Sequence, residues 1–256
     1  MDLGLVIGLV VGFGSFLISI VLEKGHFEAY MNLGAFIIIA GGTIGATTIS
    51  VSLEGMMKLP ELLKVLFSSN KKSDPESLIK TICSLANLLR REGVLSLEKE
   101  INSIEDKIFK KGLQLIADGT PAQTIADILE SEIKALSNRH KKGINIFNLM
   151  GGYAPTMGII GTVLGLVNML LALGSGGSEG LGHSVAVAFI ATLYGIIFAN
   201  VIFLPMGSNL KIKSEEEVFE KKLVLEGILA LQSGENPRMI EEKLRSFVGE
   251  RTNGKK

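Results

Sequence analysis

Four long windows without Asp, Glu, Lys or Arg constrain this chain more than any other feature of its sequence. They span Leu3–Leu22, Ala29–Leu53, Ile144–Leu173 and His183–Pro205. Each window is about 20 residues or longer, which is the length of helix that crosses the hydrocarbon core of a bilayer. A net charge of zero is uninformative here, because it averages the apolar windows with charged segments between them. The windows predict an all-α, polytopic membrane protein with four transmembrane helices.

The charged segments divide the chain into four predicted parts. Residues 1–54 hold the first two transmembrane helices, residues 55–142 form a helical insert, residues 143–206 hold the third and fourth transmembrane helices, and residues 207–256 form a helical tail.

The distribution of lysine and arginine predicts the orientation of the chain in the membrane. Of 26 such residues, 15 lie in the insert, 10 lie in the tail, and only Lys24 lies in a short loop between windows. Since positive charge is retained on the cytoplasmic side, the insert and both termini are predicted to be cytoplasmic.

Apolar spacing and helix-end signals predict the helices of the insert. In Ser77–Arg91 the apolar residues fall on one helical face, and Gly93 interrupts that pattern. A second amphipathic helix is expected over residues 94–119. Thr120 and Pro121 then predict the N-cap and first residue of a helix that runs on into the third window.

The tail carries helix-start signals as well. Ser214 with Glu217 predicts a capping box just after Pro205, which is expected to end the fourth transmembrane helix. Asn236-Pro237 predicts the start of a last short helix. Cys83, the only cysteine, is expected to be a small buried apolar residue, because it has no partner for an intramolecular disulfide.

Small residues line one face of the third and fourth windows. Pro155, Gly158, Thr162 and Gly165 share a face of the third, while Ser184, Ala188, Thr192, Gly195 and Ala199 share a face of the fourth. Small residues let membrane helices approach closely. The two faces are therefore predicted to pack together, with Thr162 and Thr192 at similar depth. Two roles stay open for these threonines, which either line an ion path or bond back to their own helix carbonyls.

The four windows lack the groups that chemistry inside a membrane requires. They contain no acidic or basic residue that holds and releases a proton, apart from His183 at a boundary. If the chain moves ions, the carboxylate must come from another subunit. Metal-ligand clusters, nucleophile–base sets and phosphate-binding loops are also missing from the sequence, so an enzyme is not expected.

Three runs resemble the MotA family of flagellar motor stator proteins. These are APTMGIIGTVLGLVNML, AVAFIATLYGIIFANVIFLPMGSNL and LLRREGVLSLEKE, and the four-span plan with one large insert matches as well. The ExbB and TolQ energising proteins share the two membrane runs in weaker form. An ExbB/TolQ-like energising subunit for envelope transport is therefore the alternative.

The resemblance implies a subunit of an ion-driven rotary unit in the bacterial cytoplasmic (inner) membrane. In the family, five chains form a ring around two copies of MotB, whose membrane Asp binds the ion. By position, Pro155 and Pro205 match prolines linked to torque coupling, while Arg90, Arg91 and Glu98 match charged residues that engage the rotor protein FliG. Without that match, these charges would be interpreted as a solvated helix face.

No cofactor is expected, and the transported ion is predicted to be H+, with Na+ as the alternative. The predicted ion pathway comprises Pro155, Gly158, Thr162, Ala191 and Thr192. In the sodium-using branch of the family, the position before the fourth-window threonine is typically also threonine, and here it is Ala191. A hard cation needs several oxygen ligands, so the missing hydroxyl favours protons.

Overall fold

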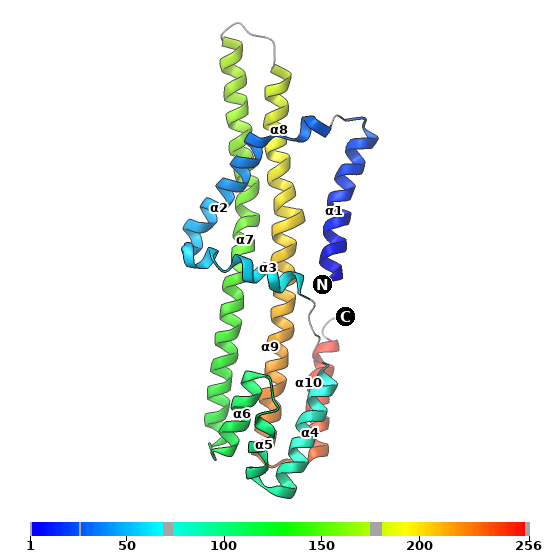
Figure 1. Ribbon diagram of the computed structural model, residues 1–256, viewed down its shortest axis with the longest axis vertical. Coiled ribbons are helices and arrows are strands. Elements are labelled where there is room, and N and C mark those ends of the chain that lie inside the picture. The colour runs from blue at the N-terminus through cyan, green and yellow to red at the C-terminus, as the bar shows by residue number, and fades with distance from the viewer. Residues whose placement is uncertain (1, 26, 69–73, 175–180, 254–256) are drawn as a thin grey trace. The chain divides into compact units, whose positions relative to one another are not determined.

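The structure, a computed structural model, describes residues 2–25, 27–68, 74–174 and 181–253, and every regular element among them is a helix. Figure 1 shows how these helices follow one another along the chain. Four helical stretches are long and apolar enough to cross a membrane, which confirms the predicted fold class. The helices are α1 (Leu3–Leu22), η1 (Phe27–Tyr30), α2 (Leu33–Met56), α3 (Leu59–Phe67), α4 (Pro75–Glu92), η2 (Val94–Ser96), α5 (Leu97–Ile101), α6 (Lys107–Ala117), α7 (Ala122–Gly174), α8 (Leu181–Ile197), η3 (Phe198–Phe203), α9 (Leu204–Gln232) and α10 (Pro237–Asn253).

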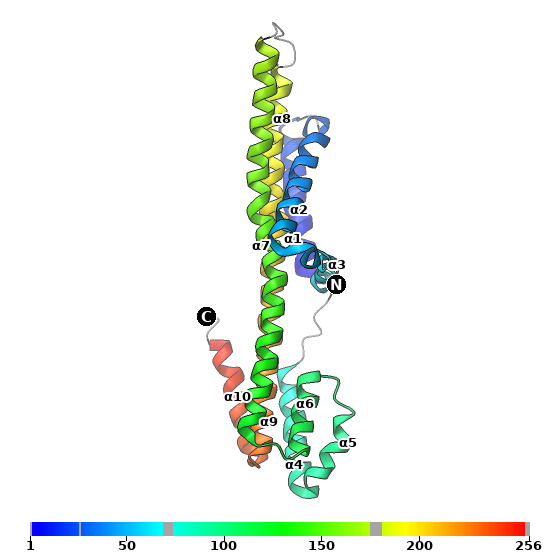
Figure 2. The same ribbon diagram turned by 90° about the vertical axis from the view of Figure 1, so that its left-hand side faces the viewer.

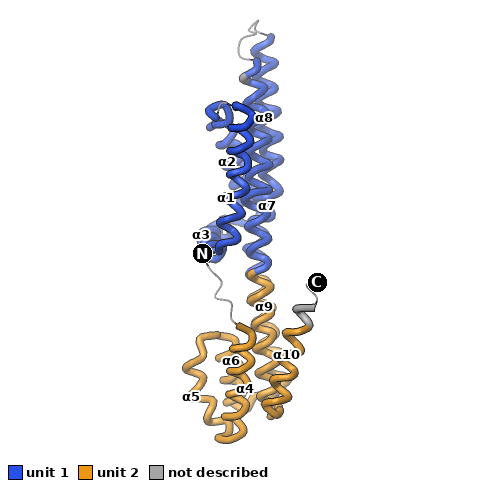
Figure 3. Tube along the Cα trace, turned by 90° about the vertical axis from the view of Figure 1, so that its right-hand side faces the viewer, with its two compact units in different colours: residues 1–70, 140–212 blue, residues 71–139, 213–256 orange. Residues whose placement is uncertain are grey.

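The chain forms two compact units, and Figure 3 colours them separately. The first contains residues 1–70 and 140–212, and the second contains residues 71–139 and 213–256. The first unit holds the apolar helices, among which α7 and α8 run side by side in both ribbon views (Figures 1 and 2). The exposed apolar residues that cover these helices, such as Leu3, Ile159 and Leu171, suit a surface in contact with lipid or with other membrane helices.

Pro205 does not end the fourth membrane helix, contrary to the sequence prediction. The chain continues as a π-helix over Phe198–Phe203 and then as α9 from Leu204 to Gln232. Proline lacks an amide donor and its ring crowds the preceding turn, so a wider i→i+5 turn just before it lets the helix continue. The predicted capping box at Ser214 and Glu217 is also wrong, since both residues lie inside α9.

The helix that contains the third apolar window begins well before that window, as predicted. α7 is one helix from Ala122 to Gly174, with Pro155 inside it. Its start differs by one residue from the prediction. The first helical hydrogen bond runs from the Ile125 amide to the Pro121 carbonyl at 3.1 Å, so Pro121 precedes the first helical residue.

The second unit is a helical bundle around one apolar core. α4 buries Ile79, Ile82, Leu85 and Ala86, which confirms the face predicted for it, and Cys83 packs partly buried against the same core. α10 begins at Pro237, with the Asn236 side chain accepting a hydrogen bond from the Arg238 amide at 3.1 Å, as predicted.

The second amphipathic helix of the insert is broken, contrary to the prediction of one helix over 94–119. η2 and α5 end at Ile101, and α6 restarts at Lys107 after the N-cap residue Asp106. The Asp106 side chain accepts a hydrogen bond from the Phe109 amide at 2.9 Å. A side chain that satisfies a free amide at a helix start makes a new start favourable.

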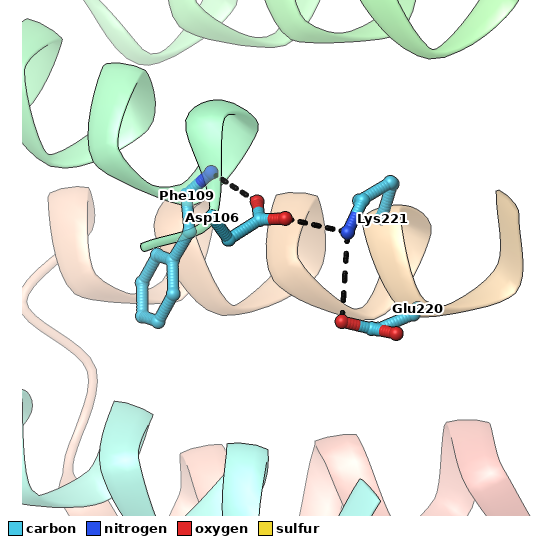
Figure 4. A network of polar contacts seen from close by, with 4 residues as sticks. All are labelled: Asp106, Phe109, Glu220 and Lys221. Carbon is cyan, nitrogen blue, oxygen red and sulfur yellow. Dashed lines mark hydrogen bonds and ion pairs between the residues drawn. The ribbon is translucent and has the colours of Figure 1, made fainter. Parts of the chain in front are cut away.

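Asp106 also joins α6 to α9 through its second carboxylate oxygen. Lys221 Nζ lies 2.5 Å from Asp106 Oδ2 and 3.5 Å from Glu220 Oε1 (Figure 4). Burial lowers the pKa of Lys221, but the hydrogen bond and charge of Asp106, followed by Glu220 and Glu217, outweigh it and raise the pKa above its ordinary value. Lys221 is only 9% exposed, yet it stays charged, because it is paired with the carboxylate of Asp106. That carboxylate is in turn held in place by its capping bond to α6.

Candidate functional site at the contact of α7 and α8

Small residues let the backbones of α7 and α8 touch, as predicted from the small-residue faces of the third and fourth windows. A Cβ atom added at Gly158 would lie 3.1 Å from the Ala191 carbonyl oxygen and 3.1 Å from the Thr192 Cα. One added at Gly195 would lie 2.5 Å from the Ala154 carbonyl oxygen and 3.2 Å from the Pro155 Cα. The contact therefore has no room for side-chain carbons at these positions, and α8 crosses α7 directly beside Pro155.

Thr162 and Thr192 meet at this contact, which confirms their predicted common depth. Their hydroxyl oxygens share a short hydrogen bond. The Thr162 hydroxyl also lies 3.0 Å from the carbonyl oxygen of Gly158 on its own helix and 3.0 Å from that of Ala188 on α8. Thr162 can donate to only one oxygen at a time. At least one oxygen of this hydroxyl cluster can therefore accept a hydrogen bond from elsewhere.

The hydroxyl cluster sits at a partly open edge of the contact. Thr162 and Thr192 are both half-buried, whereas Gly158 and Gly165 beside them are buried. Two threonine hydroxyls and two backbone carbonyls thus gather at the contact of α7 and α8. The back-bonding interpretation is confirmed for Thr162, which lies within hydrogen-bond distance of the Gly158 carbonyl of its own helix and also of the Ala188 carbonyl of α8. The ion path stays a prediction.

Ala191 lies away from this edge, in the packing between helices. It is 1% exposed and packs with Ala35 of α2 and Ile190 of α8. Its Cβ would lie 2.6 Å from a Cβ added at Gly161. A larger residue at this position would meet both α7 and α2.

Tyr194 joins the start of α2 to α8, a role that the sequence does not reveal. Its hydroxyl donates a short hydrogen bond to the Tyr30 carbonyl and accepts one from the Asn32 amide at 3.2 Å. Asn32 in turn caps α2, since its side chain accepts from the Ala35 amide at 2.8 Å. Tyr194 thereby satisfies backbone groups that would be costly to leave unpaired in a membrane. Helical spacing alone gives no signal for this bond, because its partners are far away in sequence.

The remaining predicted site residues do not belong to the hydroxyl cluster. Pro205 is exposed in the first turn of α9, in the first unit. Arg90, Arg91 and Glu98 are exposed in the second unit, at the end of α4 and the start of α5. Among the residues that the structure describes, none of these three charges has an ion-pair partner, so their charges remain available.

Sequence comparisons place these features in a known class of membrane protein. The sequence pattern of the MotA/TolQ/ExbB proton channel family matches residues 100–222, and that of the motility protein A N-terminal region matches residues 6–93. Motility protein A of Bacillus subtilis (strain 168) is 38% identical over 248 residues, covering 97% of this chain and 91% of the relative.

Solved structures agree with the sequence relatives. A chain of the flagellar MotAB stator complex from Bacillus subtilis superposes with a TM-score of 0.89 at 38% identity, covering 98% of this chain and 97% of the other. A chain of C. jejuni MotAB gives 0.90 at 28% identity, with 96% of both chains covered.

The fold and the charge-free helix contact define a polytopic membrane protein of the ion-channel type. The chain belongs to the MotA/TolQ/ExbB proton channel family, and its function is that of a flagellar stator subunit. The ExbB/TolQ-like alternative is less well supported, because the N-terminal pattern specific to motility protein A covers the first two membrane helices and α4.

Proposed function

We propose that five copies of this chain surround two copies of a MotB-like subunit, which supplies the membrane Asp that binds the transported ion. The four apolar windows contain no acid of their own, so an ion-driven unit built on them needs a carboxylate from a second polypeptide. The similar solved structures are MotAB complexes, which supports such a partner. The lysine and arginine distribution supports an inner-membrane orientation with both termini in the cytoplasm.

The hydroxyl cluster of Thr162 and Thr192 is the observation that carries the ion path. It is the place in the α7–α8 contact where hydroxyl and carbonyl oxygens gather at a partly open edge. Oxygens that exchange hydrogen bonds suit the passage of a proton to a nearby carboxylate. A sodium ion needs several oxygen ligands to replace its water, and the side chain of Ala191 adds no oxygen. We therefore assign H+ as the ion, with Na+ as the alternative.

Force reaches the rotor through the second unit in this proposal. The exposed charges of Arg90, Arg91 and Glu98, which have no ion-pair partner within the described ranges, engage the rotor protein FliG, where charges set register and encounter rate. Pro155 and Pro205 couple ion passage to helix movement. The support for Pro155 is its place in the close contact with Gly195, and the support for Pro205 is the π-helix that precedes it.

The ion path is tested by Thr162→Ala and Thr192→Ala in the complete stator complex. Removing one of these hydroxyls removes a hydrogen bond of about 1 kcal/mol, so we expect ion flux and swimming speed to fall about fivefold at unchanged abundance. Thr48→Ala is the control, since Thr48 lies on α2 outside the hydroxyl cluster and its hydroxyl donates to the Ile44 carbonyl of its own helix, at 2.7 Å. Unchanged flux in both cluster variants would contradict the path.

The identity of the ion is tested in the same cells. Swimming in sodium-free buffer that a protonophore abolishes would support protons, whereas swimming that requires sodium and survives the protonophore would contradict them.

Nutrient-uptake assays separate the stator from the ExbB/TolQ-like alternative, because a stator variant alters swimming and leaves uptake unchanged.

A further inference from the structure

A short turn between α4 and α5 is held rigidly from its inner side. Gly93 ends α4 with a φ of 78°, a left-handed conformation that favours glycine, and η2 follows it. The Ser96 hydroxyl donates to the Gly93 carbonyl at 2.6 Å, and Ser96 is buried. Leu97, the next residue, is 0% exposed in the core of the bundle. The inner half of this turn is therefore fixed by the bundle itself.

The outer half of the turn presents apolar side chains. Leu95 is 76% exposed and Val94 is 42% exposed. A single exposed leucine is ordinary on a protein surface. Here the leucine projects from a turn that is fixed beneath it, so burying it in a partner costs little ordering entropy.

Charges of both signs flank the exposed leucine along the chain. Arg90 and Arg91 precede it in the last turn of α4, and Glu98 follows it in the first turn of α5. All three are exposed, and no ion pair ties them to any described part of the chain. An apolar anchor inside a polar rim is the arrangement that protein interfaces use for their most important contacts.

We infer that Leu95, assisted by Val94, is the apolar anchor of the rotor contact and inserts into an apolar pocket of the rotor protein. Arg90, Arg91 and Glu98 then pair with opposite charges around that pocket. The inference rests on the proposed function, which assigns the three charges to the rotor and leaves the leucine without a role. It predicts that the contact combines a salt-sensitive charged part with a salt-insensitive apolar part.

Other occupants fit this surface less well. A bilayer surface attracts basic residues together with apolar ones, whereas Glu98 would be repelled by anionic lipid. A second copy of the chain could place this surface against itself only about a twofold axis. The proposed ring of five has no such axis, so its members cannot all be paired in that way.

The inference is tested with Leu95→Ser in the complete stator complex. Binding to the purified rotor protein is measured at low and at high salt, together with swimming in viscous medium. We expect Leu95→Ser to weaken binding about tenfold at both salt concentrations, since burial of a leucine side chain contributes on that order. Arg90→Glu should lose more affinity at low salt than at high salt, because salt screens exposed charges.

A matched control and a folding measurement accompany these variants. Met239→Ser removes a side chain of the same unit that is 58% exposed on α10, and it should leave binding unchanged. The thermal unfolding midpoint of the complex should not move for Leu95→Ser, because the side chain it removes is exposed. Leu95→Met should retain binding, since it keeps an apolar side chain of similar size.

Two outcomes separate this inference from the proposed function. If Leu95→Ser binds the rotor protein as well as wild type while Arg90→Glu does not, the apolar anchor is wrong and the charged contact stands. If Arg90→Glu and Glu98→Lys also leave binding and swimming unchanged, the proposed rotor contact itself fails.

A photo-crosslinking residue at position 95 should capture the rotor protein, and capture of a second copy alone would overturn the inference.

Discussion

At the scale of single residues, the absence of side-chain carbons shapes the candidate site. Gly158 and Gly195 bring the backbones of α7 and α8 into contact, and this proximity lets the Thr162 hydroxyl reach both Thr192 and the Ala188 carbonyl. Lipid offers no hydrophobic force between helices, so close van der Waals contact has to hold the pair together. The small residues and the hydroxyl cluster therefore depend on one another.

Gly195→Ala should separate the two helices. The added Cβ would lie 2.5 Å from the Ala154 carbonyl oxygen, and backbone atoms cannot move aside as a flexible side chain can. We expect a loss of about 1–3 kcal/mol in stability, which a lower unfolding midpoint of the purified complex would report, with lower ion flux. Gly152→Ala is the control on α7, because its added Cβ would meet no side chain and no other helix within 4 Å in the described part of the chain. Equal unfolding midpoints for the two variants would contradict this role for Gly195.

At the scale of helices, side chains that cap or link helix ends decide where each helix starts and what it contacts. Asp106 starts α6 and binds Lys221 of α9 with its other oxygen, so one carboxylate serves two helices. The π-helix before Pro205 does the reverse, since it allows a helix to continue where proline would end it. Both features depend on which groups lie nearby in space.

Lys221→Met should loosen α6 from α9. Asp106 would keep its capping bond but lose its cation, and a hydrogen bond between charged groups contributes about 2 kcal/mol. Chemical unfolding of the complex should report this loss. Lys243→Met is the control, since Lys243 lies 3.5 Å from Glu226 and 3.7 Å from Glu235 and its side chain is 46% exposed, so each of its two ion pairs should contribute about 0.5 kcal/mol or less. A loss no larger than that of the control would show that the link to Asp106 is not important for stability.

The pH dependence of the link between Lys221 and Asp106 follows from the direction in which the pKa of Lys221 is shifted. The pKa of Lys221 is raised in the folded protein, so its contribution is fully present below the ordinary lysine pKa of about 10.4. That contribution is lost as the pH rises through the higher folded value. The difference in stability between wild type and Lys221→Met should therefore be constant near neutral pH and shrink only in the strongly alkaline range.

At the scale of the whole molecule, the chain combines four apolar windows without acidic residues and a charged helical bundle. The contact of α7 and α8 gathers hydroxyls and carbonyls but no carboxylate, and the bundle presents Arg90, Arg91 and Glu98 without ion-pair partners among the described residues. Each unit is therefore chemically incomplete in its own way. In the proposed assembly, a membrane partner supplies the missing carboxylate, and the rotor protein supplies charges complementary to those of the bundle.

Co-expression with a MotB-like subunit should yield a detergent-stable complex with unequal numbers of the two chains. Native mass spectrometry measures that ratio, for which we expect five to two. The chain purified alone and placed in liposomes should conduct no ions, because its apolar windows hold no carboxylate. Ion flux through the lone chain, or equal numbers of the two subunits, would contradict the proposed assembly.

The sequence alone determined the four membrane helices, the small-residue faces of α7 and α8, and the meeting of Thr162 with Thr192. The spans and the faces follow from local composition and spacing, because a helix places residues three or four apart on the same face. The meeting of the two threonines was predicted by matching those two small-residue faces to each other. The tertiary structure decided the bond from Tyr194 to Tyr30 and Asn32, the link from Asp106 to Lys221, and the continuation of the helix past Pro205. Each of these depends on atoms distant in sequence or on a backbone adjustment, and helical periodicity carries no information about either.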